Sequence, residues 1–373
     1  MPASATSAPA PLRRERLVAA LNLAVVLVFM AYVLDHRGIA FASFAALLSG
    51  YLQMTIVLAF AAIVCFTAWQ LGRAGVASGW AGAPGQATGA ALRRRLREGG
   101  LFALLWPMLL FPLLMASFNA FKQRILPQAG FHFDARLAAV DRRLFGVDPG
   151  LWLHDKIGSP AVTYMLDTIY HAWFFPMAIG VALVALCAGS RTRAQYMTAY
   201  VGIWILLGAV GAYLVPAAGP CFYDALVGPV GAEPFVRINH ILATHQAANG
   251  EILSSVQIKQ MLLTSYNRPV LIMGGGISGM PSVHNALAVL FALASFRINR
   301  TVGLLMSGYA VLIAIGSVYL NWHYAIDSIT GALAAIVIWV AAGRLVDGLL
   351  YGRWLALSWR APVLAAPVAI SPG

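Results

Sequence analysis

The stretch VGLLMSGYAVLIAIGSVYLNWHYAIDSITGALAAIVIWVAAGRLV, residues 302–346, decides the fold class. It contains two apolar runs, each close to the ~20 residues that a helix needs to cross the hydrocarbon core of a bilayer. A short polar segment with His323 and Asp327 separates the two runs. Titratable side chains at a membrane junction are costly, and a function usually accounts for them. The stretch therefore predicts two membrane-spanning helices that meet at a candidate functional site.

The rest of the chain has the same character. Of its 373 residues, 60% are hydrophobic and only 10% are charged, and the mean hydropathy is +0.77. Soluble domains carry about 25% charged residues. The net charge of +12 does not indicate a nucleic-acid partner, because the basic residues form short clusters between apolar runs, as in cytoplasmic membrane loops. The composition thus predicts an integral membrane protein that sits in the bilayer and binds no nucleic acid.

Eight stretches are apolar and long enough, or nearly so, to span the membrane. They are residues 17–34, 51–71, 101–118, 164–187, 197–216, 283–296, 302–320 and 325–346. The predicted fold class is therefore all-α, a polytopic membrane helix bundle with about eight transmembrane helices. Residues 41–49 are either an interfacial segment or an extension of the second helix. The Gly- and Ala-rich residues 72–89 are expected to form a flexible linker.

Arginine clusters set the expected orientation. Five basic segments alternate with the eight spans so that all five fall on one side, which the positive-inside rule makes cytoplasmic. They contain Arg13, Arg14 and Arg16; Arg73, Arg93, Arg94, Arg95 and Arg97; Arg191 and Arg193; Arg297 and Arg300; and Arg344, Arg353 and Arg360. Both termini are then cytoplasmic, and the long connections 119–163 and 217–280 face the exterior or periplasm. The composition suggests a bacterial inner membrane, with the first span as a retained anchor.

Three polar motifs lie at the same outer depth in this topology. They are Gly279-Met280-Pro281-Ser282-Val283-His284-Asn285, His323-Tyr324-Ala325-Ile326-Asp327 and Gly219-Pro220-Cys221-Phe222-Tyr223. A histidine and an aspartate four residues apart share one helix face, where the carboxylate fixes the imidazole tautomer and frees the other nitrogen as a nucleophile. A second histidine, His284, can protonate a leaving oxygen. Each histidine alone is more simply read as an interfacial residue, but the set together predicts one catalytic site.

Two of these motifs resemble those of a known family. Pro281-Ser282-Val283-His284 and His323-Tyr324-Ala325-Ile326-Asp327 are similar to the second and third motifs of the type 2 phosphatidic acid phosphatase and vanadium haloperoxidase superfamily. The resemblance is to its inositol phosphorylceramide synthase-like (inositolphosphotransferase) branch, which also has counterparts of residues 121–153, 219–223, 279–284 and 316–327. It covers residues 101–346, six of the eight spans.

The resemblance implies a division of the chain and roles for the site residues. Residues 1–16 are then a cytoplasmic arm, 17–100 two accessory transmembrane helices with a basic linker, 101–346 a six-helix catalytic core and 347–373 a cytoplasmic tail. His323 is the expected nucleophile, Asp327 orients it, and His284 protonates the leaving group. Water or an acceptor hydroxyl would resolve the phosphohistidine. No metal or other cofactor is implied, and the sequence shows no cluster with metal-ligand spacing at the site.

The chain also departs from the wider superfamily. Val283 stands where the phosphatases have glycine, and Ser317 where they have an arginine. Their first motif, a lysine followed by Arg-Pro, has its nearest match in Lys259 and Arg268, with a longer spacing that is more simply read as coincidence. A phosphate still needs donors and cations in a low-dielectric site. The candidates are Lys122 first and Arg268 second, with Ser282, Gly219 and Tyr223 as further phosphate-binding residues.

These departures favour transfer over hydrolysis. The predicted function is a membrane lipid phosphotransferase that moves a phosphate-bearing head group between lipids at the outer leaflet. One alternative is a lipid phosphate phosphatase that hydrolyses a phosphatidate or a polyprenyl (pyro)phosphate. A non-catalytic membrane protein or a transporter is an alternative of another class. The position of the histidines near one interface and the lack of an internal repeat count against a transporter.

Other polar residues of the outer connections receive simpler interpretations. Asp134, Asp141, Asp148 and Asp155 recur every seven residues, but Gly146 and Pro149 interrupt the segment, so a solvated surface loop is expected rather than a cation site. His171, beside Trp173, is assigned to an interfacial aromatic belt rather than to substrate contact. His240 and His245 are expected on the surface, Cys221 in a turn without redox function, and residues 235–265 over the site.

Overall fold

The computed structural model describes residues 10–36, 38–77, 84–250, 252–266, 268 and 270–352. This part of the chain is helical throughout and contains no strand. Seven of its helical segments are long and apolar enough to cross a membrane, and the shorter apolar helix α13 lies between the fifth and sixth. The prediction of an all-α, polytopic bundle is confirmed. The second helix begins at Phe41, so residues 41–49 extend it.

The spans follow the chain in order. They are formed by α1 (Ala10–Leu34), α2 (Phe41–Ala77), α3 (Pro84–Arg124), the pair α6 (Pro160–His171) and α7 (Phe174–Cys187), the run α8 (Ser190–Gly202), π-helix η2 (Ile203–Gly211) and α9 (Ala212–Leu214), then α13 (Val283–Phe296), α14 (Arg300–Tyr319) and α15 (Ala325–Tyr351). Between them lie η1 (Leu126–Ala129), α4 (Asp134–Phe145), α5 (Pro149–Ile157), η3 (Pro220–Phe222), α10 (Tyr223–Leu226), α11 (Glu233–Asn249) and α12 (Ser254–Ser265).

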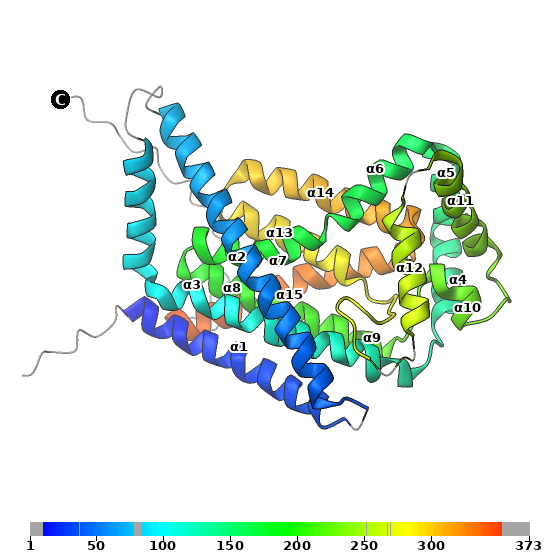
Figure 1. Cartoon of the computed structure of the whole chain (residues 1–373), viewed down its shortest axis with the longest axis horizontal. Helices are drawn as coiled ribbons and strands as arrows, with labels where there is room; N and C mark the ends of the chain where they lie inside the picture. Colours follow the sequence, from blue (N-terminus) through cyan, green and yellow to red (C-terminus); the bar gives the residue numbers. More distant parts are fainter. Residues whose placement is uncertain are drawn as a thin grey trace, which may run out of the picture.

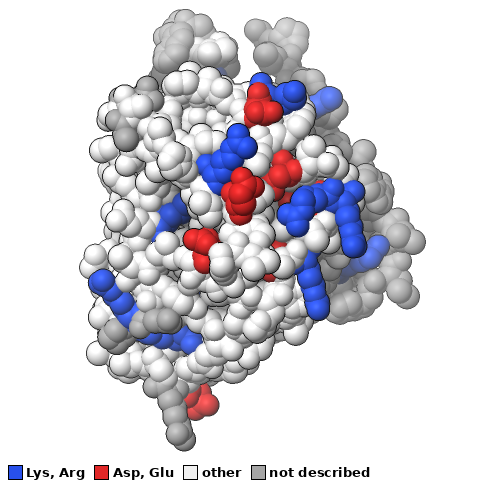
Figure 2. Space-filling view, turned by 90° about the vertical axis from the view of Figure 1, so that its right-hand side faces the viewer, with Lys and Arg blue, Asp and Glu red and all other residues white. Residues whose placement is uncertain are grey.

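The short helices cap one end of the bundle. In Figure 1, α4, α5, α10 and α11 gather at the right-hand end, while α1 begins and α15 ends at the opposite end. Figure 2 looks onto the capped end, where Lys and Arg side chains alternate with Asp and Glu. We refer to α4, α5, α10, α11 and α12 as the cap.

The linker prediction is wrong in most of its length. Helix α2 continues to Ala77 and α3 starts at Pro84, so residues 72–77 and 84–89 are helical. Residues 78–83 lie outside the described part of the chain. Alanine is the strongest helix former, and in this alanine-rich stretch it outweighs the cost of the interspersed glycines.

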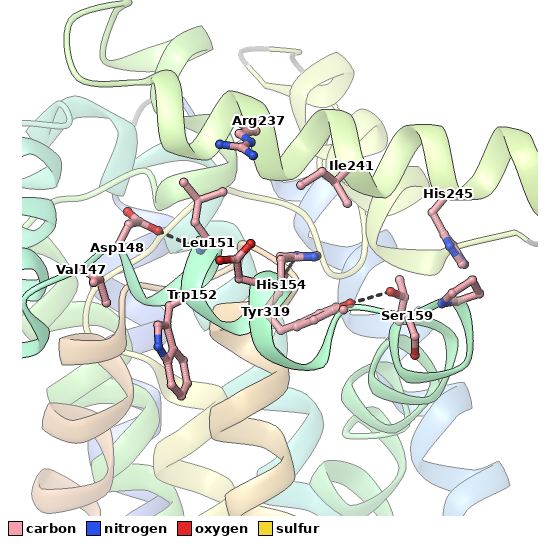
Figure 3. Close-up of a pocket in the computed structure, with 14 residues that line it drawn as sticks. Val147, Asp148, Leu151, Trp152, His154, Ser159, Arg237, Ile241, His245 and Tyr319 are labelled. Atoms are coloured by element: carbon pink, nitrogen blue, oxygen red, sulfur yellow. Dashed lines mark hydrogen bonds between the residues drawn. The ribbon is translucent and has the colours of Figure 1, made fainter.

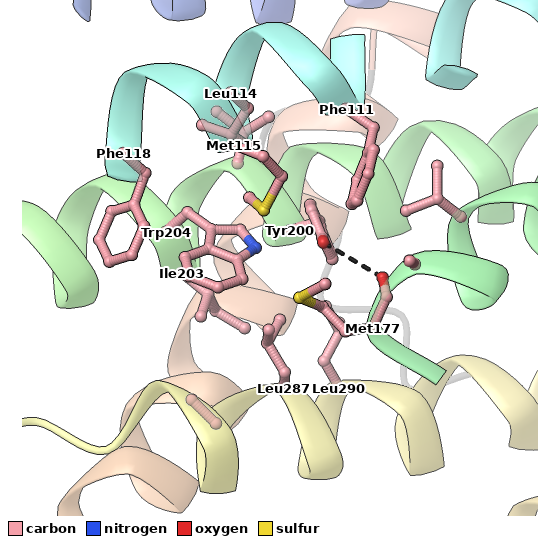
Figure 4. Packing of buried hydrophobic residues seen from close by; sticks show 14 of the residues in the cluster. Phe111, Leu114, Met115, Phe118, Met177, Tyr200, Ile203, Trp204, Leu287 and Leu290 are labelled. Atoms are coloured by element: carbon pink, nitrogen blue, oxygen red, sulfur yellow. Dashed lines mark hydrogen bonds between the residues drawn. The ribbon is translucent and has the colours of Figure 1, made fainter. Parts of the chain in front are cut away.

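Aromatic and aliphatic side chains pack together inside the bundle (Figure 4). Phe118 of α3 packs edge-on against Trp204, with ring centroids 4.6 Å apart. The hydroxyl of Tyr200 donates to the carbonyl oxygen of Met177 at 3.2 Å, which joins the fifth span to α7. Gly208 lets the Phe118 ring approach its backbone, since a Cβ there would lie 2.7 Å from the ring. Small residues and close packing of this kind hold membrane helices together.

A buried ion pair fastens the first helix to the core. Glu15 of α1 is fully buried, and both its carboxylate oxygens accept hydrogen bonds from the Arg193 guanidinium, at 2.7 and 2.9 Å. The indole Nε1 of Trp106 donates to the same carboxylate at 3.1 Å. A charge inside a membrane protein needs such partners. One charged contact therefore ties α1 and α3 to the start of the fifth span.

Candidate active site

The junction between α14 and α15 holds the first histidine. Asn321, with a φ of 65°, ends α14 in the left-handed region, which asparagine tolerates better than most residues. Helix α15 then starts after Tyr324, whose backbone N–H donates to Asp327. The carboxylate of Asp141 accepts from the N–H groups of Ala325 and Ile326, at 2.7 and 2.9 Å. These contacts fix the first turn of α15 and, with it, the position of His323.

The imidazole of His323 is held mainly by a backbone carbonyl. Its Nδ1 lies 2.7 Å from the carbonyl oxygen of Gly279 and 3.6 Å from the nearer carboxylate oxygen of Asp327. Only the first distance is a hydrogen bond. Because a carbonyl can only accept, Nδ1 carries the proton, and the unprotonated Nε2 is left as the nucleophilic nitrogen. Asp327 lies behind the ring as a fully buried partner for positive charge on it.

His284 stands in the first turn of α13, facing His323. The two ring centroids are 5.8 Å apart. His284 also packs against Trp173, with centroids 4.1 Å apart, and stacks on Tyr170 at 5.2 Å. Helix α13 starts here because the buried Ser282 side chain caps it, accepting from the backbone N–H of Asn285. The structure thus brings both histidines and Asp327 to one end of the bundle.

Two glycine loops touch each other beside His323. The N–H of Gly279 donates to the carbonyl of Ala217 at 2.7 Å, and a Cβ on Gly279 would lie 2.7 Å from the nitrogen of Gly219. The Gly219 loop is anchored in turn by Asp134, whose carboxylate accepts from the N–H groups of Ala218 and Gly219. The carbonyl that holds His323 is therefore positioned by a chain of backbone contacts that leads to α4.

The aspartates of α4 do not form a solvated loop. Asp134 is fully buried and Asp141 nearly so. Burial raises the pKa of both carboxyl groups above the usual range, while the hydrogen bonds from backbone N–H groups act in the opposite direction. The expectation of solvated side chains is wrong for these two residues, because each of them caps a distant backbone segment. Asp148 caps α5 through Leu151, and Asp155 is exposed.

A cavity of about 410 Å³ opens beside the histidine pair. Its walls include His284, His323, His171 and Lys122 together with Tyr170, Trp173, Trp204, Trp322 and the backbone of Gly274, Gly275 and Gly276. Lys122 is the only lysine or arginine among the described residues that line it. Gly276, with a φ of 90°, lets the chain pass close to Lys122, since a Cβ there would lie 2.8 Å from its Cγ. The cavity therefore combines three imidazoles and one ammonium group with aromatic walls.

The remaining predicted phosphate-binding residues lie outside the cavity lining. The side chain of Arg268 is exposed, and its carbonyl accepts from Arg124. Tyr223 is buried in a separate cluster with Phe235, and Gly219 supports the Gly279 loop. Ser282 acts as a helix cap. Contact of these four residues with phosphate stays a prediction.

Lys259 and Cys221 are buried behind the cavity. The Lys259 ammonium donates to the carbonyl of Leu320 at 2.6 Å and lies 5.2 Å from the ring centroid of Trp322. Burial lowers its pKa from the usual 10.5. Burial raises the pKa of the Cys221 thiol to about 12, so the thiol stays protonated and unreactive at neutral pH. Lys259 thus supports the turn that carries His323, and the carbonyl of Cys221 accepts from Asn239 of α11.

A second cavity lies within the cap (Figure 3). Its volume is about 520 Å³, and it is bounded by α5, the start of α6, α11 and Tyr319. Arg237 and His245 of α11 face His154 and Trp152 across it. It contains neither His284 nor His323. In the described part of the chain, no group of three or more His, Cys, Asp or Glu side chains is arranged to hold a metal ion.

The sequence predicts an interfacial aromatic belt for His171 and Trp173, but both line the cavity beside the histidine pair. The Nδ1 of His171 lies 2.8 Å from the carbonyl oxygen of Asp167 and 3.3 Å from its carboxylate. The spacing of four residues between Asp167 and His171 is the same as that between His323 and Asp327, in reverse order. The spacing of Asp167 and His171 could therefore have indicated this second histidine–aspartate pair from the sequence.

Comparison with known proteins supports one family. The model of the PAP2 superfamily matches residues 135–341, more than half of the chain, and includes both histidines and Asp327. A search of curated proteins gave no match, and a search of solved structures gave none either. The match starts in α4, includes Asp141, and ends within α15. The chain therefore belongs to the PAP2 superfamily, whose members are generally phosphatases acting on lipid phosphate.

Proposed function

We propose that this protein is a lipid phosphotransferase that works through a phosphohistidine on His323. The observation that carries the proposal is the arrangement of that ring: its Nδ1 is bonded to Gly279, so its Nε2 is the free nitrogen, and the ring lines a cavity shared with His284. An imidazole nitrogen with a fixed tautomer is a competent nucleophile. Asp327, 3.6 Å away, stabilises the positive charge that the ring gains when Nε2 bonds to phosphorus.

The first half of the reaction breaks one ester bond. Nε2 of His323 attacks phosphorus, the bond to the leaving oxygen breaks, and His284 gives that oxygen its proton. The position of His284 favours this role. Its ring faces His323, with centroids 5.8 Å apart, and packs against the rings of Trp173 and Tyr170. The ammonium group of Lys122 offsets the charge of the phosphate oxygens during the attack.

The charge of the cavity favours a phosphodiester substrate. A phosphate monoester carries about −1.5 to −2 at neutral pH and a pyrophosphate more, whereas a diester carries a single negative charge. Lys122 is the only lysine or arginine of the described lining. With Lys122 as the one lysine or arginine of this lining, the cavity suits the single charge of a diester better than the higher charge of a monoester, which supports transfer of a head group. The aromatic walls suit a substrate with apolar chains.

The end of the bundle opposite the described termini holds the site. The arginine pattern supports cytoplasmic termini and hence a site at the outer leaflet, where head groups of membrane lipids are accessible. Hydrolysis of a lipid phosphate is the alternative within the same chemistry, with water in place of the acceptor hydroxyl.

Product analysis tests this proposal. Purified protein in mixed micelles would be incubated with phosphatidylinositol, phosphatidate and a polyprenyl phosphate, each with and without a lipid alcohol, and the products read by mass spectrometry. The expected result is a new phosphodiester lipid without free inorganic phosphate, abolished by His323→Ala and retained by His240→Ala, which changes an exposed cap residue. Release of inorganic phosphate alone would replace transfer by hydrolysis, and full activity of His323→Ala would remove the phosphohistidine.

A further inference from the structure

The third imidazole of the cavity has no part in the reaction described so far. His171 ends α6 and lines the same cavity as His284 and His323. Its ring lies against Trp322, the residue before His323, with centroids 6.1 Å apart, and against Tyr170 at 5.4 Å. The side chain keeps 19% of its surface accessible. An imidazole so placed can meet a molecule that enters the cavity.

The tautomer of His171 is fixed as firmly as that of His323. Its Nδ1 donates to the carbonyl oxygen of Asp167 at 2.8 Å and lies 3.3 Å from the Asp167 carboxylate. The proton is therefore on Nδ1, and Nε2 is the basic nitrogen left for the cavity. A carboxylate against the far side of an imidazole stabilises the cation that forms when Nε2 accepts a proton. These contacts give His171 the geometry of a general base.

Asp167 also holds the helix that covers the cavity. Its carboxylate accepts from the N–H groups of Ser254 and Ser255, at 2.8 and 2.9 Å, and from the Ser255 hydroxyl at 2.5 Å. These residues begin α12, which contributes Ile258, Met261 and Leu262 to the cavity wall. The carboxylate is thus buried and fully engaged, and α6, α12 and the His171 ring form one unit beside the site.

His284 and His171, the two histidines that line the cavity with His323, have different surroundings. His284 lies among aromatic rings and faces His323. His171 is instead paired with a carbonyl and a carboxylate on its Nδ1 side. Enzymes that need both an acid and a base often separate them in this way, by the environments of two similar groups.

We propose that His171 is the base of the second half-reaction. Its Nε2 takes the proton of the acceptor hydroxyl while that oxygen attacks the phosphorus bound to His323. The new O–P bond forms, the N–P bond breaks, and its electron pair returns to Nε2 of His323. The proton then passes from His171 to His284, which gave its own to the first leaving group, so the cycle closes. This inference rests on the proposed phosphohistidine, and Asp167 is the positioning residue for His171.

A substrate that needs no acid separates the two half-reactions. Dodecyl p-nitrophenyl phosphate, a phosphodiester in micelles, loses p-nitrophenolate as the anion, so its release reports the attack by His323 alone. Rapid mixing of wild-type protein should give a burst of one p-nitrophenolate per protein and then a steady rate set by the acceptor, here glycerol or water. His171→Gln should keep the burst and lose about 100-fold in the steady rate, the usual scale for a missing general base.

Three further variants make the result specific. Exogenous imidazole should restore part of the steady rate of His171→Ala. It would not restore a rate that had been lost through a purely structural defect. His240→Gln, an exposed imidazole of the cap, should match wild type. His284→Gln is measured on the same substrate because His284 is the rival candidate for the base. If His284→Gln slows the steady rate and His171→Gln does not, His284 serves as base and the inference is wrong.

Two other outcomes are also decisive. Equal loss of burst and steady rate in His171→Gln, with an unchanged elution profile and melting temperature and no imidazole rescue, would assign His171 to structure and overturn the inference. His323→Ala should show neither phase and no phosphorylated peptide. A wild-type burst without a phosphorylated His323 would instead overturn the proposed function, and this result differs from any change confined to His171.

Discussion

The Nδ1 of His323 lies 2.7 Å from the carbonyl oxygen of Gly279, closer than its 3.6 Å distance to Asp327. Gly279 stands three residues before Ser282, the cap of the helix that carries His284. The backbone that sets the tautomer of one histidine therefore also leads directly into the helix of the other. The two motifs, about forty residues apart in sequence, are fixed to each other through one carbonyl group.

A methyl group at Gly279 should disrupt this arrangement. In Gly279→Ala the new Cβ would lie 2.7 Å from the nitrogen and 2.8 Å from the Cα of Gly219, so the loop must shift and move the carbonyl away from His323. Misplacement of a catalytic group by about 1 Å can cost 100-fold in rate, and we expect a kcat loss of that order. Gly308→Ala, where no atom lies within 4 Å, is the matched control. Wild-type kcat in Gly279→Ala would contradict the role of this contact.

Removal of the cavity's ammonium group should weaken catalysis at the phosphate. Lys122→Met keeps the aliphatic stem that packs by Gly276 but removes the charge. Loss of one preorganised electrostatic contact costs roughly 100- to 1,000-fold in kcat. Steady-state kinetics on a phosphodiester would measure it, with Lys156→Met as the control because Lys156 is exposed on the cap. Unchanged kcat/KM in Lys122→Met would assign phosphate binding to another residue.

The ion pair between Glu15 and Arg193 should make the largest contribution to the stability with which α1 is attached to the bundle. Glu15→Gln leaves the buried Arg193 without its carboxylate, and breaking a buried pair costs about 3–5 kcal/mol. Asp347→Asn breaks the Arg191–Asp347 pair, whose side chains are 32% and 26% accessible, and should cost no more than about 1 kcal/mol. Thermal unfolding in detergent compares the two variants. Equal shifts of the melting temperature would contradict the prediction that the buried pair stabilises the protein more than the accessible pair.

Lys259 should make the stability of the folded protein change with pH in the alkaline range. Its folded-state pKa is lowered from 10.5 by burial, so between that lowered value and 10.5 the unfolded chain binds more protons than the folded one. Stability then rises with pH across this window. We expect the difference in melting temperature between wild type and Lys259→Met to move in favour of wild type from pH 7 to pH 10. Lys156→Met should show no such trend, and a flat or falling difference for Lys259→Met would refute the prediction.

Local sequence patterns predicted the spans well. Apolar runs near 20 residues mark α1, α2, α3, α14 and α15, because the bilayer imposes length and composition on each helix separately. The spacing of His323 and Asp327 predicted their proximity, since both lie at one helix start. The position of Ser282 directly before α13 also indicates a helix cap, although the prediction for its hydroxyl was phosphate binding.

Contacts between distant segments were not readable in this way. Asp134 and Asp141 look like surface acids in a polar connection, yet each accepts from backbone N–H groups more than eighty residues further along the chain. Nothing near them in sequence signals such a partner. The same holds for His171, whose neighbours Tyr170 and Trp173 suggest a membrane interface, whereas the break between α6 and α7 directs all three into the cavity.

The two carboxylates of α4 have a consequence for biogenesis. Asp141 engages the backbone of Ala325 and Ile326, at the start of the last helix in the described part of the chain. During synthesis, α4 is made long before α15, so its carboxylate has no such partner until α15 has been made. The other described spans can therefore be in place before the turn that holds His323 is fixed. The geometry of the candidate site is complete only once α15 has joined the bundle.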